Sequence, residues 1–473
     1  MIGFVILTLI GLYSFGAVLF GSNFSEIHLT FSFLNFPVFI SEILMGICLI
    51  LGVSQYWRKD IVLTKWHKIF LIYWGGIILK AVWDFWTWGP LAFRNAALFY
   101  YPIFAFLGYC FYKKGYITQR YIYILLILLA FLSSRYIFDV SRGFLNTGYF
   151  RYTAFALATI LLMHVRDMRW KVLFIGMFLI FGKYAALFGE SRTNLMGTLI
   201  AFTFLGIVFI RYFLTCNRRV KITIGCGVIA IVIANTAYFA DKNGVQSCLR
   251  IRGLYGQYAS AVSYVEQTRA YYKQVEMPVA LYHDNEVKGE HPPRQGFVGK
   301  GYNGIVRVPA TISDSGRQYR ALSDAQTNGV FRILIWRDML KELMEKKSFL
   351  GVGLGKPQRS PSLEILWWGS GEWGRDGWIT PHNSFFHMIY RLGIVGVLVI
   401  IGMIGTVCHL IKVFIRVRSK EGVILVSALI YWLMISNFLV ILELPHYAIP
   451  FWTLFGMTLA YGNEILGRYK NYT

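Results

Sequence analysis

The sequence predicts an all-α protein that crosses a membrane many times and carries one large polar loop. The 473 residues are 56% hydrophobic and 17% aromatic but only 15% charged, and the mean hydropathy is +0.51. Apolar stretches of about 18 residues or more, long enough to cross roughly 30 Å of hydrocarbon, recur toward both ends of the chain. The interval from Asp241 to Pro381 is instead polar and rich in charge. We therefore expect a transmembrane helical bundle of about twelve spans.

The net charge of +23 is distributed in a way that argues against nucleic-acid binding. The basic residues gather in short segments between the apolar stretches, which is the pattern of cytoplasmic loops. These clusters are Arg58, Lys59, Lys65 and Lys68; Lys113, Lys114 and Arg120; Arg166, Arg169 and Lys171; Arg218, Arg219 and Lys221; Lys412, Arg416, Arg418 and Lys420; and Arg468 with Lys470. The six cysteines form no CxxC pair, so no disulfide framework or zinc site is implied.

Placing every basic cluster in the cytoplasm predicts twelve spans with both termini inside. The stretch that begins at Met1 has no basic region before it and no small-residue cleavage site, so we interpret it as a retained span rather than a signal peptide. The sixth and seventh spans are short and carry His164 and Lys183, which leaves a fused or re-entrant arrangement open. The spans are expected at 2–21, 30–53, 69–88, 91–112, 121–138, 152–165, 172–189, 193–213, 222–240, 384–411, 421–441 and 447–466.

This topology divides the chain into three regions. Spans one to nine occupy residues 1–240, a large periplasmic loop occupies 241–383, and spans ten to twelve with a cytoplasmic tail occupy 384–473. The periodicity of the loop is weak through residue 317, so its structure there stays open. From Val330 to Lys347 apolar residues recur at helical spacing with charges largely opposite, which predicts an amphipathic helix at the membrane surface.

Arginines also gather at the outer ends of the predicted spans, where the positive-inside pattern does not require them. They are Arg94, Arg142, Arg151 and Arg192, and the large loop adds Arg332 and His382 to the same side. Charges at membrane depth are costly and usually face a cavity or a partner. Guanidinium groups bind phosphate through paired hydrogen bonds. We therefore expect an anionic ligand, a diphosphate, at the outer face.

Three segments carry a resemblance to a known family. They are Glu190-Ser191-Arg192-Thr193 at the start of a span, Arg332-x-x-x-Trp336 with the Gly351-Val352-Gly353-x-Gly355 turn, and Pro381-His382-Asn383 followed by Gly393 and Gly396. In this order they resemble the superfamily of O-antigen ligases and O-antigen or exopolysaccharide polymerases. The resemblance is strongest over about 185–405. It implies a multi-pass enzyme of the bacterial inner membrane whose active site is periplasmic and whose donor is an undecaprenyl-diphosphate-linked glycan.

The resemblance also implies roles for individual residues. His382 would be the catalytic base, and Arg192, Arg332 and, less directly, Arg94 would bind the diphosphate. No metal and no cofactor is then required. We add residues near this rim as support or acceptor-binding candidates: Glu190, Asn383, Glu443, His446 and Trp378, the last in a run with Trp367, Trp368 and Trp373.

Each of these residues also has an ordinary structural explanation. A histidine at a span mouth is commonly an interfacial hydrogen-bonding group, and arginines there snorkel or form salt bridges. Arg94 could pair with Asp84 across the turn between the third and fourth spans. The tryptophans could form only an interfacial belt.

Several functions remain open at this level. A polymerase is slightly favoured over a ligase that transfers to lipid A core, because the outer loop is large. Their acceptors differ, being lipid-linked glycan or lipid A core, and a chain-length regulator would be a further partner beside the lipid bilayer. A lipid-linked oligosaccharide flippase is the alternative transporter. A peptidoglycan-type polymerase would instead require Asp314 or Asp324.

Overall fold

The computed structural model describes part of the chain and is mostly helical there, as predicted, with two short antiparallel hairpins in addition. The described residues are 27–31, 36–57, 65–89, 91–113, 192–215, 298–301, 304–307, 324–346, 348–365 and 381–472, with single residues at 13, 156 and between 258 and 267. The chain forms two compact units, which we describe separately. The first comprises 1–242, 353–355 and 382–473, and the second 243–352 and 356–381.

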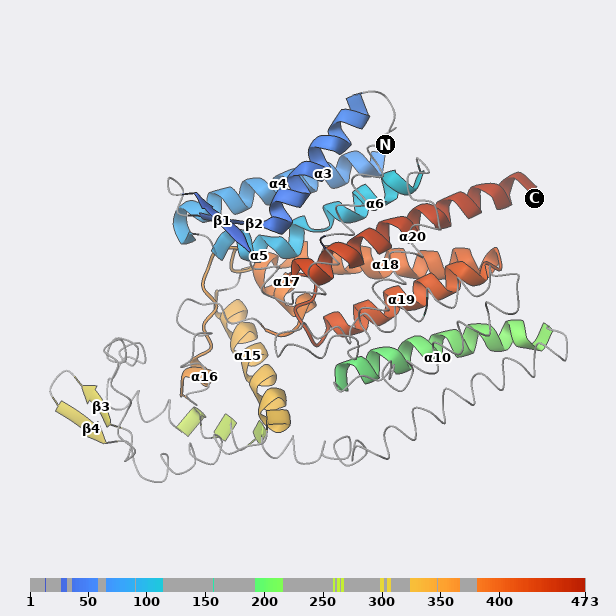
Figure 1. Ribbon diagram of the computed structural model, residues 1–473. Coiled ribbons are helices and arrows are strands. Elements are labelled where there is room, and N and C mark those ends of the chain that lie inside the picture. Colours follow the sequence, from blue (N-terminus) through green and yellow to red (C-terminus); the bar gives the residue numbers. More distant parts are fainter. Residues whose placement is uncertain are drawn as a thin grey trace, which may run out of the picture. The chain divides into compact units, whose positions relative to one another are not determined.

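The first unit is a helical bundle. Its elements are β1 His28–Phe31, β2 Phe36–Phe39, α3 Ile40–Trp57, α4 Lys65–Trp88, α5 Leu91–Tyr100, α6 Ile103–Lys113, α10 Arg192–Thr215, α17 Ser384–Leu392, α18 Ile394–Arg416, α19 Lys420–Ser436 and α20 Pro445–Tyr472. Helix α20 packs along α6, and α19 packs against both α18 and α10 (Figure 1). Large side chains such as Trp432, Phe451 and Phe104 are buried between them. This packing of apolar faces forms the core of the unit.

Three helices among the described residues are long and apolar enough to cross a membrane. They cover Lys68–Trp88, Leu91–Cys110 and Ile394–Arg416. The first two coincide with the predicted spans 69–88 and 91–112. Ile72, Leu79 and Trp83 of α4 are largely exposed, as expected for side chains that face lipid. Apart from Tyr13 and Ala156, the predicted spans at 2–21, 121–138, 152–165, 172–189 and 222–240 lie outside the described residues.

Two predicted spans begin differently in the structure. The stretch expected as a helix over 30–53 starts with the β1–β2 hairpin, and α3 begins only at Ile40. Pro37 lies in β2, and a proline there interrupts the backbone hydrogen bonds of a helix interior. The stretch expected over 384–411 is two helices, because Gly393 takes a φ of +52° between α17 and α18. A side chain at Gly396 would collide with the carbonyl of Met388, so only glycine allows this tight corner.

The fourth predicted span is also interrupted, at Pro102 between α5 and α6. Pro102 has no N–H to donate, and Phe104 donates its backbone N–H to the Tyr101 carbonyl at 2.9 Å. The Trp74 indole N–H reaches the Tyr100 carbonyl at 3.0 Å. Beside this break, the hydroxyls of Tyr100 and Tyr101 donate to one oxygen of Glu42 at 2.7 and 2.9 Å. Neighbouring helices thus satisfy the polar groups that the break exposes.

Helices α6 and α20 approach each other closely at glycines. A Cβ at Gly456 would meet the carbonyl oxygen of Ala105, and a Cβ at Gly108 would lie 2.6 Å from that of Thr453. Small residues allow such close backbone contact between membrane helices.

We expect Gly456→Ala to destabilise the bundle by about 1–3 kcal/mol, because the two backbones must separate to admit a methyl group. The matched control is Gly467→Ala in the same helix, where an added Cβ meets no atom within 4 Å. That change should be neutral or stabilise by up to about 1 kcal/mol. Thermal unfolding of both variants in detergent measures the difference, and equal midpoints would contradict the close approach.

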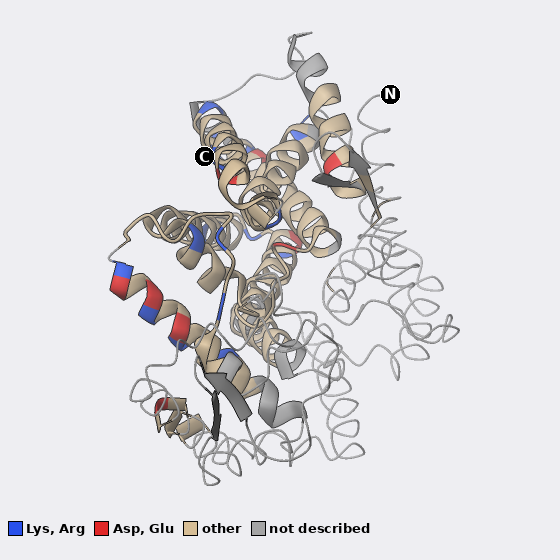
Figure 2. Cartoon of the chain, turned by 90° about the vertical axis from the view of Figure 1, so that its left-hand side faces the viewer, with Lys and Arg blue, Asp and Glu red and all other residues tan. Residues whose placement is uncertain are grey.

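The second unit contains α15 Asp324–Lys346, α16 Pro361–Ile365 and the hairpin of β3 Val298–Gly301 with β4 Gly304–Arg307. The buried Asp338 of α15 accepts hydrogen bonds from the Ser360 hydroxyl at 2.6 Å and from the Ser362 amide and hydroxyl at 2.8 and 2.7 Å. These bonds join α15 to the segment of α16. Figure 2 shows acidic and basic residues alternating along α15. The expected helix is confirmed from Val330 to Lys346, residue 347 lies outside the described residues, and the position of the helix on the membrane surface stays a prediction.

Candidate active site

His382 lies immediately before α17 with an unusual backbone conformation. Its φ is +50°, in the left-handed region of the backbone that residues other than glycine and asparagine rarely adopt. The next residue, Asn383, is the N-cap of α17, and its side-chain oxygen accepts the Phe386 amide at 2.8 Å. The His382 side chain is half-buried. The cap therefore holds a partly accessible imidazole at the entrance to a helix.

The start of α17 is also bonded to the connection between α19 and α20. The Ser384 hydroxyl donates to the Leu439 carbonyl at 3.0 Å and accepts the Leu442 amide at 3.3 Å. Leu442 directly precedes Glu443, one of the predicted support residues. These bonds fix the segment of His382 and the segment of Glu443 to each other within the first unit.

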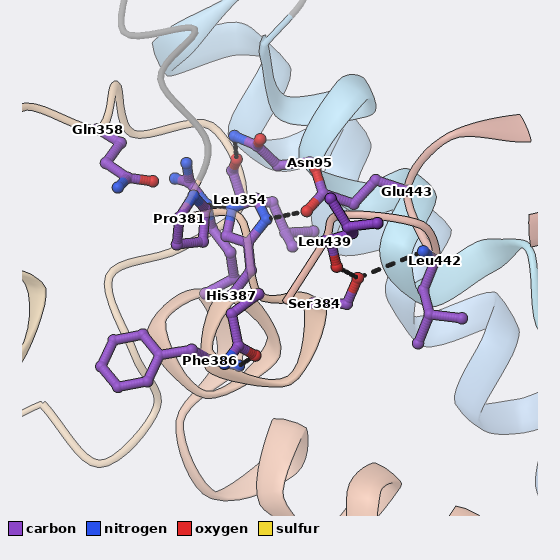
Figure 3. A network of polar contacts seen from close by, with 12 residues as sticks. Asn95, Leu354, Gln358, Pro381, Ser384, Phe386, His387, Leu439, Leu442 and Glu443 are labelled. Atoms are coloured by element: carbon purple, nitrogen blue, oxygen red, sulfur yellow. Dashed lines mark hydrogen bonds and ion pairs between the residues drawn. The ribbon is translucent and has the colours of Figure 1, made fainter. Parts of the chain in front are cut away.

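Glu443 contacts His387, a residue that the sequence analysis did not single out. One Glu443 carboxylate oxygen lies 2.5 Å from His387 Nδ1, and the His387 side chain is fully buried. On the other side of the ring, Arg391 Nε donates to His387 Nε2 at 2.8 Å. Figure 3 shows His387 facing Glu443. The three side chains form a buried polar chain, which we call the Glu443 network.

Glu443 lies between the predicted spans 421–441 and 447–466. Burial raises the pKa of Glu443, but His387, Arg94 and Arg391 outweigh this effect, so that the net shift of that pKa is downward. Glu443 is accordingly ionised at neutral pH.

Among the described residues, Arg94 is a predicted diphosphate ligand whose charge acts on the Glu443 network. It lies in α5 with a half-buried side chain, and its charge acts on Glu443 and on His387. The suggested Arg94–Asp84 pair is not formed. Asp84 instead pairs with Lys80 at 2.5 Å and accepts the Leu354 amide at 2.8 Å.

The glycine turn of the sequence motif is bound to the same unit. The Asn95 side chain donates to the Leu354 carbonyl at 2.6 Å, as Figure 3 shows. Gly353 exchanges hydrogen bonds with Arg391, its amide donating at 3.0 Å to the Arg391 carbonyl and its own carbonyl accepting from the guanidinium at 3.4 Å. Gly353 has a φ of +92°, and an added Cβ at Gly355 would lie 2.5 Å from the Trp88 Cβ. Glycine is required at both positions for these contacts.

In the second unit, Arg332 lies on α15 with a half-buried side chain. Trp336, one helical turn later, donates its indole N–H to the Pro381 carbonyl at 2.7 Å. Pro381 is the residue before His382 in the chain. Within the second unit, this bond joins α15 to Pro381.

The remaining predicted site residues are only partly described. Arg192 is the first residue of α10, as expected for a residue that opens a span. His446 lies in the first turn of α20. Glu190 and Trp378, together with Arg142, Arg151, Trp367, Trp368 and Trp373, lie outside the described residues.

A family comparison agrees with the motif order. Residues 175–401 match the family model described as O-antigen ligase. Over this region, a little under half of the chain, the sequence is similar to the O-antigen ligase family. No curated protein matches the chain. The matched region runs from before Arg192 to within α18 and includes Arg332, His382, His387 and Arg391, so the predicted resemblance to the O-antigen ligase and polymerase superfamily is confirmed.

The sequence could not single out the Glu443 network, because its members are far apart along the chain. Glu443 and His387 are separated by 56 positions. The one local signal is the spacing of His387 and Arg391, which places them on the same face of a helix.

Proposed function

We propose that the protein is an inner-membrane glycosyltransferase that moves a glycan from an undecaprenyl-diphosphate donor to a sugar hydroxyl on the periplasmic side. The observation that carries this proposal is the half-buried imidazole of His382, held at the entrance of α17 inside a region that matches the O-antigen ligase family. The twelve-span topology, with residues 241–383 in the periplasm, is part of the proposal. It would place His382 at the boundary between polar loop and lipid.

The proposed reaction is a single displacement that inverts the anomeric carbon. His382 accepts the proton of the acceptor hydroxyl while the hydroxyl oxygen attacks that carbon. The bond between the carbon and the diphosphate oxygen breaks, and undecaprenyl diphosphate leaves with the electron pair. Arg192 and Arg332, with Arg94, stabilise the charge that develops on the leaving group. The proton on His382 is then lost to water, so the base is regenerated.

A polymerase and a ligase would share this donor chemistry and differ in the acceptor. The large outer segment favours a polymerase of O-antigen or exopolysaccharide, and the family match favours a ligase that transfers to lipid A core. We propose the polymerase as the first function to test and the ligase as the second. A chain-length regulator would be a partner of the polymerase alone.

The test uses purified full-length protein in proteoliposomes with an undecaprenyl-diphosphate-linked repeat unit. We expect the lipid-linked glycan to lengthen, with release of undecaprenyl diphosphate. Transfer only to added lipid A core would replace the polymerase by the ligase. Movement of the intact donor between leaflets without cleavage of the glycosidic bond would contradict both and indicate a flippase.

A further inference from the structure

Helix α18 presents an exposed stripe that changes from apolar to basic along its length. Its members are three, four or seven positions apart, so they share one face of the helix. All of them are exposed: Ile394, Leu398, Ile401, Cys408, Lys412 and Arg416. We call this face the α18 stripe. Its apolar part can contact lipid chains, and its basic end can bind an anion.

The basic end of the α18 stripe lies at the depth of lipid headgroups. The helix Ile394–Arg416 is long and apolar enough to cross a membrane, and Arg416 is its last residue. Ile401 precedes Lys412 by 11 positions, about 16 Å at 1.5 Å per residue. That length is close to half of a hydrocarbon core of roughly 30 Å. An acyl chain of one leaflet therefore fits along the stripe and brings its phosphate to Lys412 and Arg416.

Four basic residues at the end of α18 and the start of α19 form no ion pair with a residue that the structure describes. They are Lys412, Arg416, Arg418 and Lys420. Lys412 and Arg416 are four positions apart in one helix, and like charges at that spacing repel each other. An anion that binds between them lowers this electrostatic cost. The basic end therefore favours a phosphate group, which ammonium and guanidinium groups both bind.

Tyr461 of α20 holds the helix ends together at this place. Its hydroxyl donates to Glu421 at 2.8 Å and lies 3.2 Å from Ser419 Oγ, at the start of α19. Its ring packs against Phe414 of α18 and Tyr112 of α6, with centroids 5.7 and 6.3 Å apart. Helices α18, α19 and α20 contact one another in the bundle (Figure 1). The turn between α18 and α19 is therefore fixed in place, as selective binding requires.

We propose that the α18 stripe binds one anionic phospholipid, with an acyl chain along its apolar part and the phosphate at Lys412 and Arg416. On the proposed topology this end of α18 is cytoplasmic, so the lipid belongs to the inner leaflet. Basic residues there orient the chain during insertion, which needs no bound lipid. The proposal adds that the folded protein retains an anionic lipid in preference to a zwitterionic one. It does not depend on the proposed glycan transfer.

The first test measures phosphatidylglycerol binding to the full-length protein in detergent by native mass spectrometry, with phosphatidylcholine as the comparison. We expect the wild type to prefer phosphatidylglycerol. Lys412→Gln and Arg416→Gln should each weaken phosphatidylglycerol binding about fivefold, the usual contribution of one basic residue at a membrane surface. Phosphatidylcholine binding should not change. Each variant keeps three of the four basic residues, so the orientation of the chain should be preserved.

Arg468→Gln is the matched control. It removes one exposed arginine from α20 at the same end of the bundle, but this arginine pairs with Glu464 at 2.5 Å and is not part of the α18 stripe. Phosphatidylglycerol binding should change less than twofold. Equal losses in all three variants would show that only the total charge matters and would overturn the proposed site. Equal binding of the two lipids by the wild type would also overturn it.

Photo-crosslinking of the wild-type protein remains decisive if the variants do not fold. The probe is phosphatidylglycerol with a diazirine group in one acyl chain, placed in nanodiscs, and the adducts are located by peptide mass spectrometry. We expect adducts between Leu398 and Cys408 that excess unlabelled phosphatidylglycerol removes and excess phosphatidylcholine does not. Adducts that both lipids remove equally, or that lie only outside residues 394–416, would contradict the proposal.

Discussion

Replacing His382 with asparagine is expected to reduce kcat for glycan transfer by about 10²–10⁴-fold, the usual contribution of a general base. Asparagine is chosen as the replacement because it tolerates the left-handed backbone conformation that His382 adopts at φ +50°. The helix entrance should therefore be preserved while the base is lost. The measurement is the initial rate of undecaprenyl diphosphate release at saturating donor, with the melting temperature recorded in parallel.

Two further variants separate chemistry from backbone strain. His382→Gly removes the imidazole and any strain together, so it should be as inactive as His382→Asn. His409→Ala is the matched control, because His409 is an exposed histidine in α18 and belongs to no network described above. It should retain wild-type rates. Normal turnover in His382→Asn would exclude His382 as the base, whatever the stability of that variant.

Replacing Arg192 with alanine is the second change for which we expect a large effect, a loss of about 10²–10³-fold in kcat/KM. A guanidinium that stabilises charge on a leaving diphosphate acts in the transition state as well as in the bound complex, so both kcat and KM should change. Arg192→Lys should recover only part of the loss, because an ammonium group lacks the paired hydrogen-bond geometry of guanidinium. Donor titrations with a radiolabelled lipid-linked repeat unit measure these values.

The control for Arg192 lies on the same helix. Arg211 is 19 positions further along α10, about 28 Å away along the helix axis at 1.5 Å per residue. On the predicted topology it is at the cytoplasmic end. Arg211→Ala should therefore leave kcat/KM within twofold of the wild type. An equal loss in both variants would indicate a structural role of α10 rather than a diphosphate site.

His382 and His387 differ in the chemistry that they can perform, because the fold places them in different surroundings. His382 and His387 are five residues apart, and the sequence motif points to His382 alone. The structure leaves His382 half-buried at the helix entrance and buries His387 completely between a carboxylate and a guanidinium. One imidazole can accept a proton from a substrate and the other cannot.

The length of the apolar stretches, the helical periodicity and the order of the motifs were sufficient to predict the class of protein and the family that it resembles. The length of the apolar stretches predicted α4 and the helical stretch from Leu91 onward, and the helical spacing of apolar residues predicted α15. The order of three short motifs predicted the O-antigen ligase family, which the match over residues 175–401 confirms. Each of these signals is local, since the thickness of the bilayer and the pitch of a helix act on consecutive residues.

Contacts between distant segments were decided only by the tertiary structure. Glu443 meets His387 across 56 positions, and Leu354 meets Asn95 and Asp84 across 259 and 270 positions. No periodicity encodes such pairs, because they depend on which helices pack together. The sequence by itself determined a helical membrane protein with the motif residues of one glycan-transferring family. The packing of α17 against the segment before α20 decided that Glu443 meets His387, and the packing around α4 decided that Asp84 pairs with Lys80, because a buried charge must be balanced by whichever partner the fold brings near.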